Sequence, residues 1–157
     1  MNLSAFSLAE RFVGIREAAG PTSNAHVLAM LQLDTAWVTK DEVAWCSAFV
    51  NYVCWILRLP RSKSLSARSW LAVGTPTELS AAKVGYDIVV LARGDGEQPG
   101  PEVLAAPGHV GFFAGLEGER LWLLGGNQGD AVSVAPFSSD RILGVRRLFS
   151  EDASRVA

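Results

Sequence analysis

A cysteine near the start of a predicted helix is the first candidate for chemistry in this sequence. Asp41-Glu42 is expected to open that helix, and Cys46 follows about one turn later. Backbone N–H groups at a helix N-terminus stabilise a thiolate, so we expect a lowered pKa and a reactive thiol at Cys46. The opposing interpretation is that a small cysteine on a helix packs in the core. We expect that of Cys54, which lies deeper among apolar residues.

A cysteine nucleophile needs a base, and the base needs a group that orients it. His109 follows Pro107-Gly108 at the start of a predicted strand and is the candidate base. Asn127 follows two glycines at the end of another predicted strand and is the candidate orienting group. Two neighbouring antiparallel strands would hold the two side chains next to each other. Gln128 and Asp130 are alternatives for the third position, and a tight turn would also explain Asn127.

The cysteines and histidines offer little support for a disulfide or a metal site. Cys46 and Cys54 lie in one predicted helix, and their separation of roughly 12 Å along its axis is too long for a disulfide. The sequence has no CxxC pair, so a zinc site is poorly supported and we expect no metal. His26 lies in a short predicted helix without a partner motif, and we interpret it as a surface residue or core filler.

The elements that must position these residues follow from the period of the apolar residues. Helices are expected first, at 4–19, 24–33, 41–57 and 67–73. Strands are expected afterwards, at 88–91, 109–114, 121–124, 132–135 and 142–148. Helices followed by a mostly antiparallel sheet of about five strands give the α+β class. We expect N-terminal helices packed on that sheet.

Composition excludes several classes of protein. The chain has 157 residues, of which 49% are hydrophobic and 19% charged, which fits one domain and excludes a disordered chain. The net charge of -2 lacks the basic excess of a nucleic-acid-binding module. No signal peptide and no membrane-spanning run is present, so we expect synthesis in the cytoplasm and no membrane insertion. We expect a single catalytic domain over 1–157, with its core at about 8–148 and a frayed tail at 150–157.

Three segments resemble motifs of the CHAP and NlpC/P60-type peptidoglycan hydrolases. AWCSAFVN at 44–51 resembles their WCxxFVN nucleophile motif, and GHVGFF at 108–113 resembles their histidine strand. LGGNQ at 124–128 is similar to a segment of a CHAP-like subfamily common in phage lysis proteins. The segments 66–71 and 87–90 match that subfamily as well, and the resemblance covers about residues 8–147. One departure is Tyr86, which stands where the subfamily often has glycine.

The resemblance implies a papain-like fold and a cysteine peptidase or amidase that cleaves an amide bond of bacterial peptidoglycan. It implies Cys46 as nucleophile, His109 as base and Asn127 as the group that orients the imidazole. The backbone N–H of Cys46 would stabilise the oxyanion. The substrate would be the stem peptide or glycan, contacted by Trp45, Trp70 and Gln128. Since tryptophan is usually well buried, the opposing interpretation of the two tryptophans is core packing.

The resemblance also bears on partners and on the place of action. A phage lysis protein without a signal peptide would reach the wall through a holin. A secreted amidase effector of the same fold would be delivered into a competitor and would have an immunity protein as partner. We expect a monomer in either case. A wall-binding module that kept the fold without catalysis is the further alternative.

Overall fold

The computed structural model describes residues 3–149, so the tail expected at 150–157 lies outside the described residues. Its helices are α1 (Ala5–Ala9), α2 (Ala25–Gln32) and α3 (Cys46–Ile56). Short 3-10 helices are η1 (Glu10–Phe12), η2 (Ala67–Ala72), η3 (Leu79–Ala81) and η4 (Ser139–Arg141). The strands are β1 (Thr75–Thr77), β2 (Asp87–Ala92), β3 (Gly108–Glu117), β4 (Arg120–Gly125), β5 (Ser133–Ser138) and β6 (Ile142–Arg147).

The strands form one six-stranded antiparallel sheet with the order β1-β6-β2-β3-β4-β5. The expected α+β class and antiparallel sheet are confirmed, and β1 is the strand that the sequence pattern missed. It has only three residues with a proline in the middle, so it shows no apolar alternation. β1 pairs with the edge of β6, where Thr75 lies opposite Arg147.

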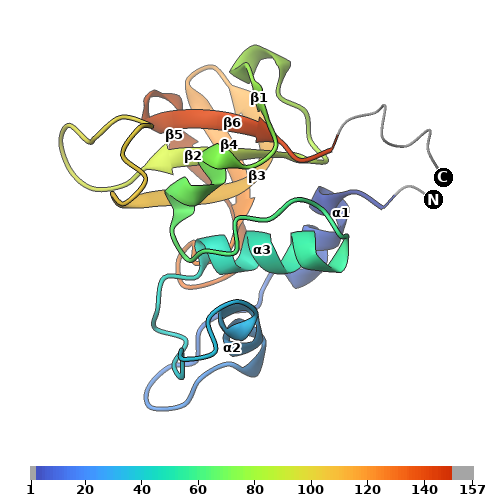
Figure 1. Cartoon of the computed structure of the whole chain (residues 1–157), viewed down its shortest axis with the longest axis vertical. Coiled ribbons are helices and arrows are strands. Elements are labelled where there is room, and N and C mark those ends of the chain that lie inside the picture. Colours follow the sequence, from blue (N-terminus) through green and yellow to red (C-terminus); the bar gives the residue numbers. More distant parts are fainter. Residues whose placement is uncertain (1–2, 150–157) are drawn as a thin grey trace.

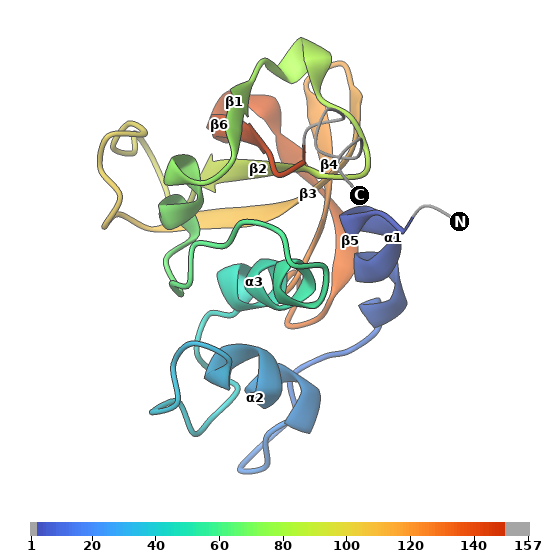
Figure 2. The same ribbon diagram turned by 45° about the vertical axis from the view of Figure 1, so that its right-hand side comes forward.

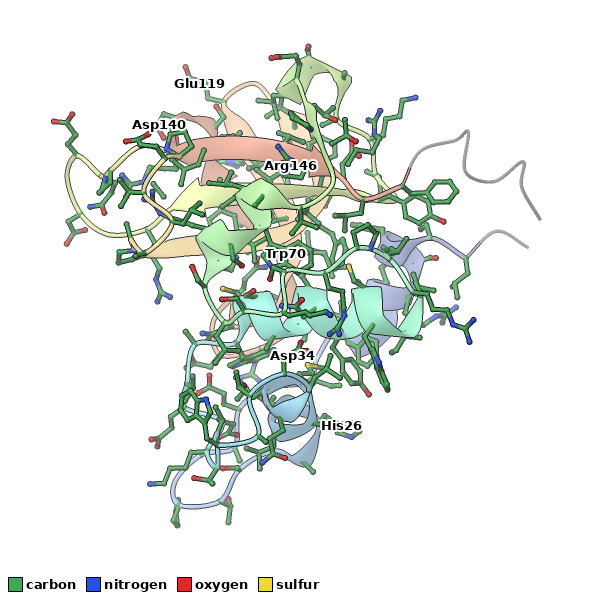
Figure 3. The ribbon with its side chains drawn as sticks, in the orientation of Figure 1. His26, Asp34, Trp70, Glu119, Asp140 and Arg146 are labelled. Atoms are coloured by element: carbon green, nitrogen blue, oxygen red, sulfur yellow. The ribbon has the colours of Figure 1, made fainter. Side chains whose placement is uncertain are left out.

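The helices form two layers on one face of this sheet. α3 packs against the sheet, and α2 lies on the far side of α3 (Figure 1). The turned view shows α1 beside α3 and the end of β5 (Figure 2). Aromatic rings fill the space between α3 and β3, where Phe49 meets Phe112 edge to face at 6.2 Å. Trp70 from η2 belongs to the same buried core cluster (Figure 3).

The opposite face of the sheet is also apolar. Strand alternation sends Val110 and Phe112 toward α3 and turns Phe113 to the other side. There Phe113 packs with β2 and β4, and Phe137 of β5 and Ile142 of β6 cover that cluster. His109 shares the face of Phe113, since the two residues lie four apart on β3. The base candidate therefore lies on the face opposite the α3 layer, at the end of β3 that comes closest to the start of α3.

Two helices begin or end at other residues than the sequence predicts. The helix expected to continue to residue 19 ends at Phe12, after Ser4 and Ser7 cap its start reciprocally. The helix expected to begin at Asp41 begins at Cys46 instead. The Asp41 carboxylate accepts hydrogen bonds from the backbone N–H groups of Ala18 and Asn24, at 3.0 and 2.7 Å, and so ties its own segment to the 18–24 loop.

No helix within residues 3–149 has both the length and the apolar character needed to cross a bilayer. His26 is exposed on α2, on the helical layer farthest from the sheet (Figure 3). It is a surface residue, as one of the two interpretations expected.

Candidate active site

Cys46 is the first residue of α3 and is only 3% exposed. The backbone N–H groups of Val110, Ser47 and Cys46 itself favour the thiolate form and act to lower its pKa. Burial nevertheless raises the pKa of the thiol, against these donors and the positive charge of Arg93. The lowered pKa expected from the helix N-terminus is therefore wrong for the resting protein, because desolvation outweighs the helix end. The Val110 contact places the thiol beside the residue that follows His109.

The N-terminus of α3 reaches the sheet because β4 ends early. β4 stops at Gly125, and the chain turns away at Gly126. A Cβ atom at Gly126 would lie 2.7 Å from both the Trp45 ring and the Phe49 Cβ. The missing side chain lets α3 press against this turn. The close approach of the helix thus explains Gly126, the second of the two glycines before Asn127.

His109 forms its side-chain hydrogen bond with Gln128. His109 Nε2 and Gln128 Oε1 are 2.9 Å apart, and both residues are buried. The Gln128 amide nitrogen donates to the carbonyls of Leu123 and Ser133, at 3.1 and 2.7 Å. With the nitrogen held by two acceptors, Oε1 faces the imidazole and accepts a proton from Nε2. The ring is therefore the Nε2–H tautomer, and Nδ1 keeps the lone pair that a base needs.

Asn127 occupies the turn before Gln128 and forms no hydrogen bond with His109 in the described chain. Its φ of 56° is left-handed, a conformation that asparagine tolerates better than most residues. Asp130 has a φ of 58° in the same turn, and its carbonyl accepts from the Glu17 N–H at 2.8 Å. Of the three candidates for the third position, Gln128 is the one that the structure brings to the imidazole. Space for its amide comes from Gly125, where a Cβ atom would lie 2.5 Å from Oε1.

The two tryptophans expected to contact substrate are fully buried in this structure. Trp45 donates its indole N–H to Glu17 at 2.6 Å, and Trp70 donates to the Ser47 hydroxyl at 2.9 Å. Both therefore support the site from within the core and present no surface to a ligand. Trp37 and Trp55 are the exposed tryptophans of the described chain, with 73% and 50% of their surfaces accessible. Cys54 is buried in α3, and burial raises its pKa to about 12, as suits an unreactive core thiol.

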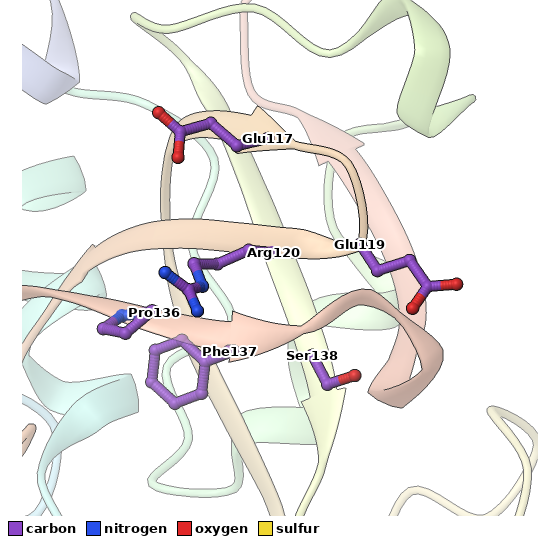
Figure 4. Close-up of a pocket in the computed structure, with 6 residues that line it drawn as sticks. All are labelled: Glu117, Glu119, Arg120, Pro136, Phe137 and Ser138. Carbon is purple, nitrogen blue, oxygen red and sulfur yellow. The ribbon is translucent and has the colours of Figure 1, made fainter.

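A cavity of about 500 Å³ opens beside His109 and Gln128. Phe137 forms one wall, and its ring stacks on the imidazole with 5.1 Å between centroids. His109 lines this cavity and Cys46 does not. A second cavity adjoins it across Phe137, toward Arg120 on β4 (Figure 4). The two cavities share Pro136, Phe137 and Ser138 of β5 as lining residues.

Arg93 is the residue of this site that sequence reasoning missed. It follows the last residue of β2, lines the cavity beside His109, and is exposed. Its charge acts on both titrating groups, since it favours the thiolate of Cys46 and disfavours protonation of His109. A basic residue directly after the strand 88–91 was the available signal, but sequence alone gives no reason to bring it to the site. No group of three or more metal-ligating side chains is present in the part of the chain that the structure describes.

The loop that leads into β3 is held by a buried arginine. Arg68 on η2 is fully buried and donates to the carbonyl of Pro107, two residues before His109, at 2.9 Å. It also donates to three carbonyls farther back in the loop, those of Pro99, Gly100 and Val103. Its Nη2 atom has no partner among the described residues. Arg68 therefore fixes the path by which the chain arrives at the imidazole.

Replacing Arg68 with methionine should destabilise the protein by about 2–4 kcal/mol, because buried carbonyls lose their donors. Urea unfolding of the two proteins measures the difference. Arg11→Met is the matched control, since Arg11 is exposed on η1 and should change stability by less than about 0.5 kcal/mol. Equal midpoints for the two variants would show that the loop does not depend on Arg68.

The pKa of His109 predicts a loss of stability in acid. Burial lowers this pKa most, Arg93 lowers it further, and the hydrogen bond to Gln128 acts in the opposite sense. Below about pH 6.5 the imidazole binds a proton more readily in the unfolded chain than in the folded protein. The free energy of unfolding therefore falls as pH drops. One such group contributes at most about 1.4 kcal/mol per pH unit. Denaturation between pH 7.5 and 5 should show a smaller pH dependence for His109→Gln than for the wild type, and an unchanged dependence would contradict the assignment.

Comparison with known proteins gives one informative result. No protein-family model matches the chain, and no curated protein matches it either. The chain does match the solved structure of NlpC1 from Trichomonas vaginalis, with a TM-score of 0.55 over 94% of this chain and 44% of that one. This chain has an NlpC-like fold. At 14% identity the match shows the fold alone, and the chain spans less than half the length of NlpC1. The NlpC-like fold confirms the expected papain-like architecture.

Proposed function

We propose that the protein is a cysteine hydrolase that cleaves an amide bond of bacterial peptidoglycan. The observation that carries this proposal is the arrangement around the start of β3. His109 is held in the Nε2–H tautomer by Gln128, and the backbone N–H of the neighbouring residue Val110 favours the thiolate of Cys46. The NlpC-like fold and the motif resemblance at 44–51, 108–113 and 124–128 support the substrate class.

In the proposed reaction the thiol of Cys46 attacks the carbonyl carbon as Nδ1 of His109 takes its proton. Burial disfavours the charged form of both groups, so the resting pair is neutral and ionises when the substrate engages. The imidazolium then gives its proton to the leaving amine. Gln128 keeps the ring in one orientation throughout, because its oxygen accepts from Nε2. Water attacks the thioester and releases the acyl product, so no cofactor enters the cycle.

The oxyanion of the tetrahedral intermediate would form at the start of α3. The first N–H groups of a helix have no partner inside the helix, and Cys46 is the first helical residue. Its own N–H already faces the sulfur. We assign the backbone N–H of Cys46 as one oxyanion donor, since negative charge develops next to it.

Digestion of purified sacculi tests the proposal. The protein should release soluble muropeptides, and mass spectrometry of the new termini should identify the bond that is cut. A new stem-peptide N-terminus attached to no muramic acid would mean an amidase that acts at the muramoyl bond, whereas a cut inside the stem would mean an endopeptidase. Intact sacculi after prolonged digestion, with a folded protein, would refute the proposal. Phage lysis protein and secreted effector share this chemistry, and their genomic neighbours, a holin gene or an immunity gene, distinguish them.

A further inference from the structure

The cavity beside His109 is positively charged. Arg93 and Arg141 both line it, and its lining includes no aspartate or glutamate. The remaining walls are mostly apolar or glycine, with Phe137 as the largest side chain. A cavity of about 500 Å³ with this lining suits a small group that carries a negative charge.

Arg93 is the arginine available to such a ligand. The two ion pairs found within residues 3–149 are Arg61–Asp34 and Arg147–Asp87, and Arg93 takes part in neither. Arg141 has a different task. Its guanidinium donates to the carbonyls of Gly94 and Gly96 and so holds the loop that follows Arg93. In this cavity Arg141 is held by the loop, whereas the planar guanidinium of Arg93 can pair with a carboxylate.

The position of the cavity decides which half of the substrate would enter it. In amide hydrolysis the leaving amine takes its proton from the imidazole, so the leaving group must lie on the imidazole side of the thiol. His109 lines the cavity and Cys46 does not. The half of the substrate that departs as an amine is therefore the half that faces Arg93.

We propose that Arg93 and the adjoining cavity form a leaving-group subsite for an amino acid that carries a free carboxylate. This inference rests on the proposed function for the direction of cleavage. It states that the residue released with a new amino group bears a carboxylate within reach of the Arg93 guanidinium. Ala135 and Phe137 would contact the aliphatic part of that residue.

The test compares two forms of one substrate. Purified sacculi are treated with carbodiimide and ammonia, which converts their free carboxylates to carboxamides, and mock-treated sacculi keep the charge. The wild type should release muropeptides about tenfold more slowly from the amidated wall, since a charge-assisted hydrogen bond is lost. The quantity compared is the ratio of the rate on mock-treated sacculi to the rate on amidated sacculi. Arg93→Met should reduce this ratio to near one, Arg93→Lys should keep part of the wild-type ratio, and Arg11→Met should have the same ratio as the wild type.

The ratio is the decisive quantity, because the charge of Arg93 also acts on Cys46 and His109 and its loss will change the absolute rate. A wild-type ratio of one, or an unchanged ratio in Arg93→Met, overturns the inference. Co-sedimentation of the Cys46→Ala variant with the same two walls measures binding without turnover. If no wall is hydrolysed but binding still depends on Arg93 and on free carboxylates, the proposed function fails and Arg93 is a carboxylate-binding site without a leaving group. If hydrolysis proceeds and neither readout responds to amidation, the subsite fails and the function stands.

Discussion

Replacing Cys46 with alanine should lower the release of muropeptides by at least about a thousandfold, because the nucleophile is lost and no second thiol can take its place. Cys54 lies in the same helix, but it is fully buried and its pKa of about 12 keeps it neutral. The matched variant Cys54→Ala should retain at least about a third of the wild-type rate, with a small loss of stability from the shortened side chain.

The comparison of the two alanine variants separates chemistry from folding. Both substitutions remove one sulfur from α3, so both should leave the circular dichroism spectrum unchanged. Rates on purified sacculi then report the role of each thiol. Hydrolysis that survives Cys46→Ala would show that this cysteine is a core residue after all. A loss of activity in Cys54→Ala alone would move the nucleophile eight residues along the helix, to a fully buried thiol.

Replacing Gln128 with alanine should lower turnover by about a hundredfold. The wild-type ring donates from Nε2 to Gln128, which leaves the lone pair on Nδ1. Without the amide the two tautomers interconvert, and the ring also loses the partner that fixes its angle. Gln128→Glu keeps an acceptor oxygen but adds a negative charge, so it should raise the pKa of His109 and shift the acid limb of the rate profile to higher pH.

Asn127→Gly is the matched control for Gln128→Ala. The left-handed φ of 56° at this position is one that glycine adopts without strain, so the turn should keep its shape while the side chain disappears. We expect a change in turnover of less than about threefold, since Asn127 does not contact the imidazole. Nitrogen chemical shifts of the His109 ring provide a second measurement, because a shift toward the other tautomer is expected for Gln128→Ala alone. If Asn127→Gly lowered turnover more than Gln128→Ala, Asn127 would be the residue that orients the imidazole.

The sequence predicts the order of elements and the placement of Cys46 and His109 on them better than it predicts the electrostatics of the two groups. The 3.6-residue period locates the helix of Cys46, and the two-residue period locates the strand of His109. The start of the helix was misplaced by five residues, because Asp41 and Glu42 look like a favourable first turn while Asp41 in fact binds backbone N–H groups of another loop. The sign of the thiol pKa shift depends on burial, and burial depends on how tightly α3 meets the turn at Gly126.

The choice between Asn127 and Gln128 shows what a local pattern cannot resolve. Both residues carry an amide, and both follow the same pair of glycines. Which of them reaches the imidazole depends on the backbone angles of a single turn and on two carbonyls, those of Leu123 and Ser133, that lie on different strands. Arg93 poses the same difficulty, since its place in the site depends on which strands are neighbours in the sheet.

Arg68 recognises the 99–107 loop by four main-chain oxygens. A clamp of this kind is indifferent to side chains, so the loop can accept many sequences and still deliver the imidazole to the same place. The exposed positions 101–105 of this loop are therefore suitable for a randomised library, because their side chains can change while the carbonyls that fix the approach to His109 stay in place.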